Sequence, residues 1–117
     1  MTKPLRGEVW SVNFEPAIGA EIQKTRPAVV MNPDSIGRLP LRIVVPITDW
    51  QPRYTALPWF VHLSLDPSNG LSKASAPDAF QVKSVSETRF VKRLGVLTVQ
   101  QTEDIADAVV LCVGFGL

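Results

Sequence analysis

The chain has 117 residues, of which 45% are hydrophobic and 20% charged, and this composition excludes a disordered protein. The length leaves room for one domain, which we expect to span residues 1–117. No apolar run reaches the roughly 20 residues of a membrane-spanning helix, and the N-terminus does not resemble a signal peptide. The single cysteine, Cys112, excludes an internal disulfide and fits a reducing compartment. These features predict a cytoplasmic protein without membrane contact.

The charges are distributed unevenly along the chain. Twelve Lys and Arg against eleven Asp and Glu give a net charge of +1. The segment from Thr98 onward holds three acidic and no basic residues, so residues 1–97 carry twelve positive and eight negative charges, a net +4. A basic field of this kind would attract a phosphate backbone. An ordinary mixed surface with one acidic helix explains the same counts.

Six short segments are predicted to be strands because their apolar residues alternate with polar ones or form β-branched runs. In chain order they are 8–14, 27–31, 41–47, 59–65, 79–85 and 91–97. Pro46 cannot donate to a ladder, so we expect it at a strand end or a bulge. The longest connections, 15–25 and 49–58, are where functional residues are expected.

The C-terminal segment changes to a helical period. Thr98 and Gln101 form a T-x-x-Q capping box. One apolar face then carries Ile105, Val109, Cys112 and Val113, and Gly114 and Gly116 supply a stop. The prediction is a mainly β protein with a C-terminal α-helix packed on a small, barrel-like antiparallel sheet.

The number and spacing of histidines, cysteines and carboxylates argue against metal-dependent and two-histidine chemistry. His62 is the one histidine, so a two-histidine acid/base pair within the chain is excluded. No Cys/His cluster has zinc spacing, and the carboxylates are scattered, so we expect no metal site and no cofactor. Cys112 is expected to be a buried core thiol, and His62 a solvated residue.

The polar loop before residue 27 is the main candidate for chemistry. Glu21, Lys24 and Arg26 lie close together there, and Pro27 favours an extended Arg26. An arginine fixed at the root of a strand can present its planar fork to a phosphate. Thr48 would lie beside Arg26 only for one register of the strands. The plain alternative is a solvated pair of Glu21 and Lys24.

Blocks of sequence along nearly the whole chain resemble the MazF/PemK family of bacterial toxins. These blocks are R-G-E-V-W at 6–10, K-T-R-P-A-V-V at 24–30, V-P-I-T at 45–48, G-L-S-K-A-S at 70–75 and Q-V-K-S-V at 81–85. The resemblance implies an SH3-like small barrel that works as a homodimer. It also implies the toxin of a type II toxin–antitoxin pair, with a cognate antitoxin protein as a partner.

The activity implied by this resemblance is sequence-specific, metal-independent cleavage of single-stranded RNA. The 2′-OH would attack its own phosphodiester and leave a 2′,3′-cyclic phosphate and a 5′-OH. Family members place active-site residues at the positions of Arg26 and Thr48, and we expect Glu21 to be the general base. The expected RNA-binding residues are Lys24, Thr25, Trp50, Tyr54, Lys73, Asp78, Gln81 and Lys83.

One departure from the family pattern concerns acid/base chemistry. Phe80 stands where some relatives have an acidic residue, and Asp78 would share its strand face if the strand were regular. Lys83 replaces a frequent arginine and lacks its bidentate fork. Three alternatives therefore stay open: a gyrase-directed toxin of the same fold, a non-enzymatic SH3-like binding module, and a family member with weak activity that binds only RNA or antitoxin.

Overall fold

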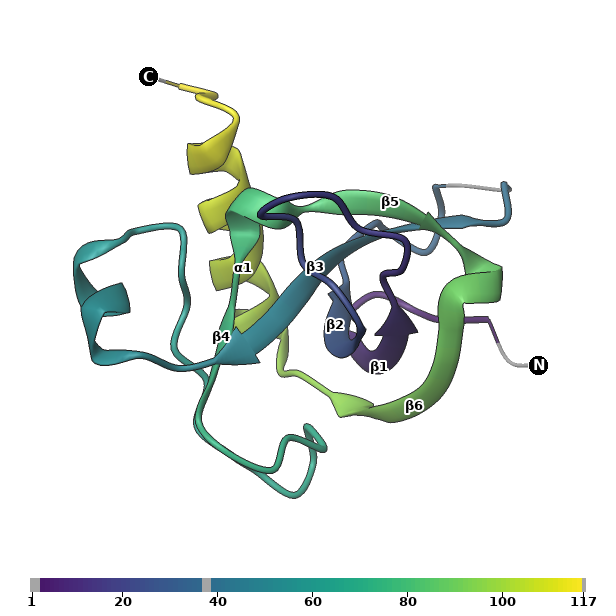
Figure 1. Ribbon diagram of the computed structural model, residues 1–117, viewed down its shortest axis with the longest axis horizontal. Helices are drawn as coiled ribbons and strands as arrows, with labels where there is room; N and C mark the ends of the chain where they lie inside the picture. Colours follow the sequence, from purple (N-terminus) through teal and green to yellow (C-terminus); the bar gives the residue numbers. More distant parts are fainter. Residues whose placement is uncertain (1–2, 37–38, 117) are drawn as a thin grey trace.

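The computed structural model describes residues 3–36 and 39–116, and in this part antiparallel strands precede a single α-helix (Figure 1). The strands are β1 Glu8–Asn13, β2 Thr25–Val30, β3 Leu41–Asp49, β4 Ser75–Pro77, β5 Lys83–Ser86 and β6 Phe90–Val96. The helix α1 spans Val99–Cys112, and three 3₁₀ turns are η1 Pro52–Ala56, η2 Ala79–Gln81 and η3 Glu87–Arg89. The predicted class, mainly β with a C-terminal helix, is confirmed.

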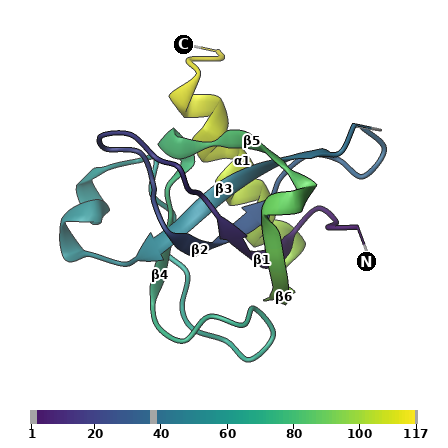
Figure 2. The ribbon, with the colours of Figure 1, turned by 45° about the vertical axis from the view of Figure 1, so that its right-hand side comes forward.

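The strands pair in the order β4-β3-β2-β1-β6, and β5 pairs with β3. One edge of the long strand β3 pairs with two other strands. Its first half pairs with β5, and its last residues pair with β4. The described pairings run from β4 to β6 without a bond between those two ends, so the curved sheet is open. Two loops, around residues 50–60 and 63–74, extend away from this sheet in two views (Figures 1 and 2).

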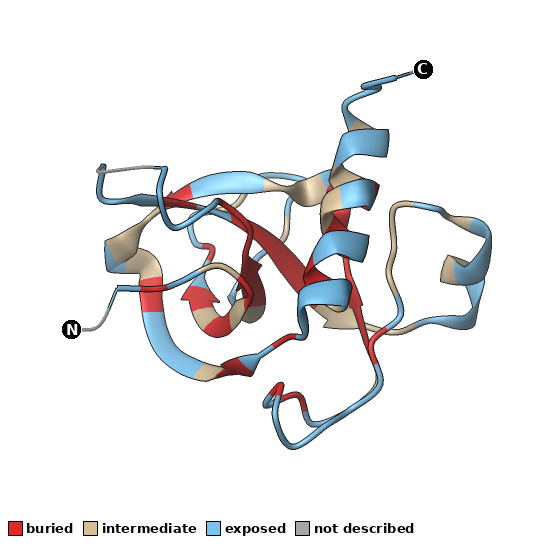
Figure 3. Cartoon of the chain, turned by 180° about the vertical axis from the view of Figure 1, so that it is seen from behind, coloured by how far each residue is buried: buried red, intermediate tan, exposed pale blue. Residues whose placement is uncertain are grey.

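Alternate residues of the sheet supply two separate cores. Val29 and Val45 belong to one core, which α1 covers through Ile105. Ala28 and Val44 point the other way into a second core. Because neighbouring residues of a strand face opposite sides, the nearly continuous apolar runs of β2 and β3 serve both cores. Figure 3 shows the buried stripe of α1 against the buried strands.

The helix begins where the sequence predicts. The backbone N–H of Gln101 donates to Thr98 Oγ1 at 3.1 Å, and the N–H of Thr98 donates to Gln101 Oε1 at 2.9 Å, so the capping box is complete. The predicted apolar face is right at Ile105 and wrong at its end, where Cys112 is half-buried and Val113 is exposed. The last turn of the helix projects beyond the sheet (Figures 1 and 3).

Two strand predictions need correction. Residues 59–65 form only two isolated bridges, Phe60 with Asp78 and Leu63 with Ser75. Pro46 lies inside β3 opposite Ala28, neither at a strand end nor at a bulge. It is tolerated because β3 changes partner around it, pairing with β5 up to Val44 and with β4 from residue 47 onward. The missing N–H of Pro46 therefore falls between two ladders.

The expected strand 79–85 is also interrupted. Its first part is the 3₁₀ turn η2, and only residues from 83 onward form β5. The Asp78 carboxylate starts this turn by accepting a hydrogen bond from the N–H of Phe80. The short strand β4 just before it was not predicted. In the part of the chain that is described, no helix combines the length and the apolar character needed to cross a membrane.

Candidate active site

Arg26 and Thr48 line one cavity of about 330 Å³ at the end of β2 and β3. The last paired residues of the two strands at this end are Ala28 and Pro46, and the same register continued by two residues sets Arg26 level with Thr48. The strand register that the sequence left open is thus one that brings the two residues to the same cavity.

Two hydrogen bonds in the loop before β2 hold the backbone that leads to Arg26 and the Arg26 side chain. The Lys24 backbone has a positive φ of 66°, and its N–H donates to Glu15 Oε1 at 2.6 Å. Arg26 Nε donates to the carbonyl of Gln23 at 3.4 Å. Among the described residues no carboxylate lies within ion-pair distance of the half-buried Arg26 guanidinium, so its charge is available to an anion.

The same cavity receives Thr25, Asp49 and Lys73 from its other walls. Lys73 Nζ lies 3.0 Å from Asp49 Oδ2, and both side chains are largely exposed. The structure therefore brings together four predicted residues, Thr25, Arg26, Thr48 and Lys73, with Asp49 as an ion-pair partner that the sequence did not single out.

A second cavity, of about 600 Å³, collects four more of the polar candidates. Glu21, Asp78, Gln81 and Lys83 line it together with apolar residues. These apolar neighbours are Ala20, Ile22, Trp59, Phe80 and Val82. The apolar walls come from three distant segments, and no local pattern in the sequence indicates that they meet.

Glu21 is not among the residues that line the cavity beside Arg26 and Thr48. Its side chain is exposed, and its Oε1 accepts the N–H of Ile18 at 2.7 Å within the same loop. The structure therefore places the expected general base with Asp78 and Gln81, whereas the phosphate-binding candidates lie in the other cavity.

Asp78 is the buried carboxyl of the second cavity. It is 8% exposed, and burial raises its pKa above the ordinary range, against the opposing effect of hydrogen bonds from Gln81 and Phe80. Gln81 Nε2 donates to Asp78 Oδ2 at 3.2 Å, and the N–H of Phe80 donates to Oδ1 at 3.1 Å.

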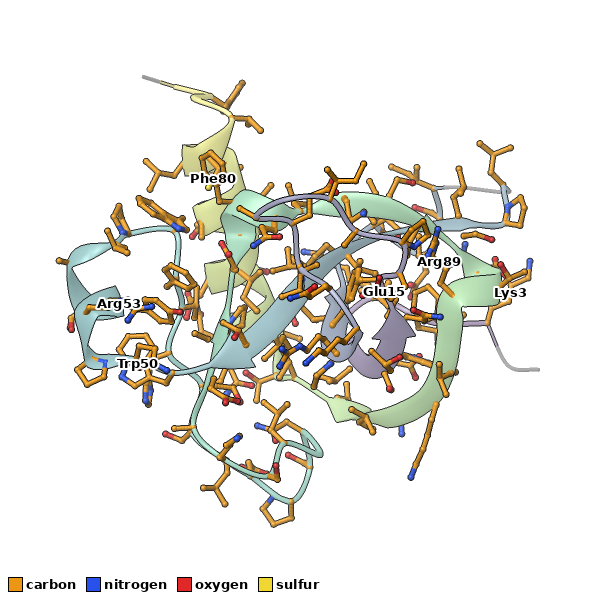
Figure 4. The ribbon with its side chains drawn as sticks, viewed as in Figure 1. Lys3, Glu15, Trp50, Arg53, Phe80 and Arg89 are labelled. Atoms are coloured by element: carbon orange, nitrogen blue, oxygen red, sulfur yellow. The ribbon has the colours of Figure 1, made fainter. Side chains whose placement is uncertain are left out.

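The expectation that Asp78 and Phe80 share a strand face is wrong. The 3₁₀ turn directs Asp78 inward and leaves Phe80 68% exposed. The Phe80 side chain extends from this turn beside α1 (Figure 4). Cys112 was expected to be a buried core thiol and is only half-buried. Burial and the charge of Asp78 both raise the pKa of its thiol.

Trp50 and Tyr54 belong to a separate aromatic cluster. Their rings meet edge to face with centroids 5.8 Å apart, and Trp50 also contacts the exposed His62 at 4.6 Å. Tyr54 stacks on Phe60 at 3.7 Å, and the Arg53 guanidinium lies 5.3 Å from the Tyr54 ring. This cluster holds together the loop that carries η1, where Figure 4 shows Trp50 and Arg53.

In residues 3–36 and 39–116, no group of three or more His, Cys, Asp or Glu side chains is placed to share a metal ion. The side chains that line the two cavities offer hydrogen bonds and charge. Arg26, Lys73 and a hydroxyl are suited to an anion, while a buried carboxylate among apolar walls is suited to a ligand with donor groups.

Known proteins align with most of the chain. Residues 5–113 match the family model described as PemK-like, MazF-like toxin of type II toxin–antitoxin system. The endoribonuclease MazF9 of Mycobacterium tuberculosis is 30% identical over 112 residues, covering 91% of this chain and 92% of that protein. The endoribonuclease PemK of Escherichia coli is 43% identical over 44 residues, or 37% of this chain and 33% of that protein.

Solved structures show the same fold. A MazF crystal structure from Deinococcus radiodurans superposes with a TM-score of 0.80 at 23% identity and covers 98% of this chain and 100% of that chain. An endoribonuclease in complex with its cognate antitoxin, from a mycobacterial species, gives a TM-score of 0.73 at 17% identity over 97% of this chain and 98% of that chain.

Proposed function

The chain belongs to the PemK-like, MazF-like toxin family of type II toxin–antitoxin systems, and from this premise we propose that it is a toxin that cuts single-stranded RNA. The observation that carries the proposal is that Arg26 and Thr48 line one cavity at the end of β2 and β3. A guanidinium and a hydroxyl that open onto one cavity form a donor set for a phosphodiester.

The reaction we propose uses a nucleophile that belongs to the RNA. The 2′-oxygen forms a bond to the adjacent phosphorus and loses its proton, while the bond from phosphorus to the 5′-oxygen breaks and that oxygen gains a proton. The products are a 2′,3′-cyclic phosphate and a 5′-OH. Arg26 and Thr48 donate to the non-bridging oxygens, where negative charge grows in the transition state. We propose that this chemistry proceeds without a metal ion.

Glu21 remains our proposed proton acceptor. Because its carboxylate lies in the neighbouring cavity, this role requires loop 15–25 to move toward Thr48 when RNA binds. A Glu21→Gln variant tests it, because the amide keeps the bond from the Ile18 N–H but cannot take a proton. An unchanged rate in this variant would assign the proton transfer to another group.

Two protein partners belong to the proposal. One is a cognate antitoxin whose acidic segment covers the basic part of the molecule, where residues 1–97 carry a net +4. The other is a second copy of the chain. The exposed apolar residues at the end of α1 favour such an association, and they are Val110, Leu111, Val113 and Phe115.

The test is incubation of the purified protein with a long mixed-sequence RNA in excess EDTA, followed by mapping of the fragment ends. We expect site-specific cuts with 5′-OH ends that Arg26→Ala abolishes. Arg93→Ala is the matched control, because Arg93 pairs with Glu8 on the strand pair β1–β6. Intact RNA with folded, antitoxin-free protein would contradict the proposal and direct attention to gyrase supercoiling.

A further inference from the structure

The second cavity has two aromatic walls and a polar floor. Trp59 and Phe80 lie side by side with ring centroids 6.0 Å apart, inclined at 55°, and the Phe80 ring is largely exposed. Ile22 and Val82 extend the apolar lining. Exposed aromatic faces beside a recess are the arrangement on which flat ring systems stack.

The floor of this cavity presents acceptors. Each oxygen of the Asp78 carboxylate receives one protein hydrogen bond, and a carboxylate offers about four lone-pair positions, so acceptor capacity remains. The amide of Gln81 holds the carboxylate in place, and its own oxygen accepts the N–H of Ile22 at 2.5 Å. The floor is therefore preorganised for a donor group that enters the cavity.

The cavity is connected to the Arg26 site through one short stretch of loop. Ile22 donates to Gln81 in the floor, and the next residue, Gln23, accepts the Nε of Arg26. Thr48 pairs with Ala76, and Asp78 lies two residues beyond Ala76 on the same edge of β3. A chain that binds Arg26 with one of its phosphates can thus place a neighbouring group in this cavity.

We propose that this cavity holds one unpaired base of the RNA and that the Asp78 carboxylate selects a base with an exocyclic amino group. The proposal rests on the proposed function and adds to it a determinant of sequence specificity. Cytosine, adenine and guanine each carry an amino group that can donate to a carboxylate. Uracil has no amino group, and its one donor at the base-pairing edge, N3–H, lies between two carbonyl oxygens. The repulsion between these oxygens and the Asp78 carboxylate weakens a hydrogen bond from N3–H, so uracil is disfavoured.

The occupant is a nucleobase rather than an apolar protein side chain because of the charged groups that line the recess. An apolar side chain would bury the Asp78 carboxylate without a new hydrogen bond, which is costly. A base satisfies both parts of the lining, with its faces against Trp59 and Phe80 and its amino group toward Asp78. Lys83, which also lines the cavity, supplies a cation for the attached phosphate.

Binding can be measured without cleavage. The probes are fluorescein-labelled 2′-O-methyl oligonucleotides of ten cytosines, ten adenines or ten uracils, which lack the nucleophile, and the readout is fluorescence anisotropy at fixed salt. We expect the cytosine and adenine oligonucleotides to bind roughly tenfold more tightly than the uracil one. Asp78→Asn removes this difference, because an amide can donate to a carbonyl. The control Asp107→Asn, at an exposed position of α1, keeps it.

A second pair of variants tests the aromatic walls and covers the case in which Asp78→Asn does not fold. Trp59→Ala weakens binding of all three oligonucleotides by roughly 5- to 150-fold, the range for loss of one stacked base. Trp59→Phe keeps an aromatic face and loses less. Equal binding of the three oligonucleotides by the native protein, or no binding at all, overturns the proposal and leaves a partner protein as the occupant.

Cleavage mapping separates this proposal from the proposed function. If the native protein cuts RNA with an amino base fixed at one position, and Asp78→Asn accepts uracil there, both stand. If RNA is cut and Asp78→Asn keeps the native sequence preference, the base-selecting cavity is wrong and the ribonuclease stands. If the oligonucleotides are discriminated while 2′-OH RNA stays intact, the cavity stands and the ribonuclease is wrong.

Discussion

Gln81 holds the buried carboxyl of Asp78 with its side-chain nitrogen at 3.2 Å while its side-chain oxygen receives the N–H of Ile22 at 2.5 Å. A single amide thus fastens loop 15–25 to the turn η2, across 59 positions of sequence. This link brings the loop that carries Glu21 against the cavity floor.

Removing this amide should loosen the loop and lower the stability. In Gln81→Ala, the Ile22 N–H and one Asp78 oxygen lose their partner, and we expect the free energy of unfolding to fall by about 1–2 kcal/mol. Urea denaturation measures the change. Gln51→Ala, an exposed residue whose side chain makes no capping bond, should stay within about 0.5 kcal/mol of the native protein. Equal stabilities of the two variants would show that the link contributes nothing.

The hydroxyl of Thr48 should matter for rate and not for folding. Thr48→Val keeps the β-branched shape that suits β3 and removes one donor, so we expect the cleavage rate constant to fall by about 10²–10³. Single-turnover cleavage with native RNA measures it. The exposed Thr55→Val in η1 serves as the control and should cleave at the native rate. A Thr48→Val rate within threefold of native would remove Thr48 from the site.

The pKa of Asp78 predicts the pH dependence of stability. Burial raises this pKa in the folded protein above the ordinary value of 3.8, so the folded state prefers the protonated carboxyl. The protonated carboxyl therefore stabilises the fold fully below pH 3.8, and this contribution is lost as pH rises through the raised folded-state pKa.

Asp78→Asn removes this one titration, so its stability relative to the native protein should improve as pH rises across that window. Urea denaturation at several pH values, with Asp107→Asn as the control, gives the comparison. A native-minus-variant difference that does not change with pH would show that the pKa of Asp78 is the same in the folded and unfolded chains.

The reactivity of the Cys112 thiol provides a second measurement of the Asp78 charge. Burial and the negative charge of Asp78 raise the pKa of the thiol, which lowers the thiolate fraction and slows alkylation. We expect Asp78→Asn to shift the pH profile of the reaction with iodoacetamide to lower pH, while Asp107→Asn leaves it unchanged. Identical profiles for all three proteins would mean that the Asp78 charge does not reach the thiol.

Local signals in the sequence located several elements correctly. The capping box at Thr98 starts α1, and the alternation around Trp10 predicts β1, because both depend on neighbours in the chain. The alternation over 59–65 was misleading. Of those residues only Leu63 is buried, and only two bridges connect the segment to a neighbour, so it does not form a strand.

The sequence by itself determined the class and the C-terminal helix, and it singled out Arg26 and Thr48 as candidates, because local periods, caps and family motifs depend on the order of residues along the chain. Only the tertiary structure decided which residues meet. The pairing of β2 with β3 brings Arg26 and Thr48 to one cavity, and the 3₁₀ turn η2 buries Asp78 while exposing Phe80. Such relationships depend on backbone hydrogen bonds between distant segments, which the order of side chains along one strand does not specify.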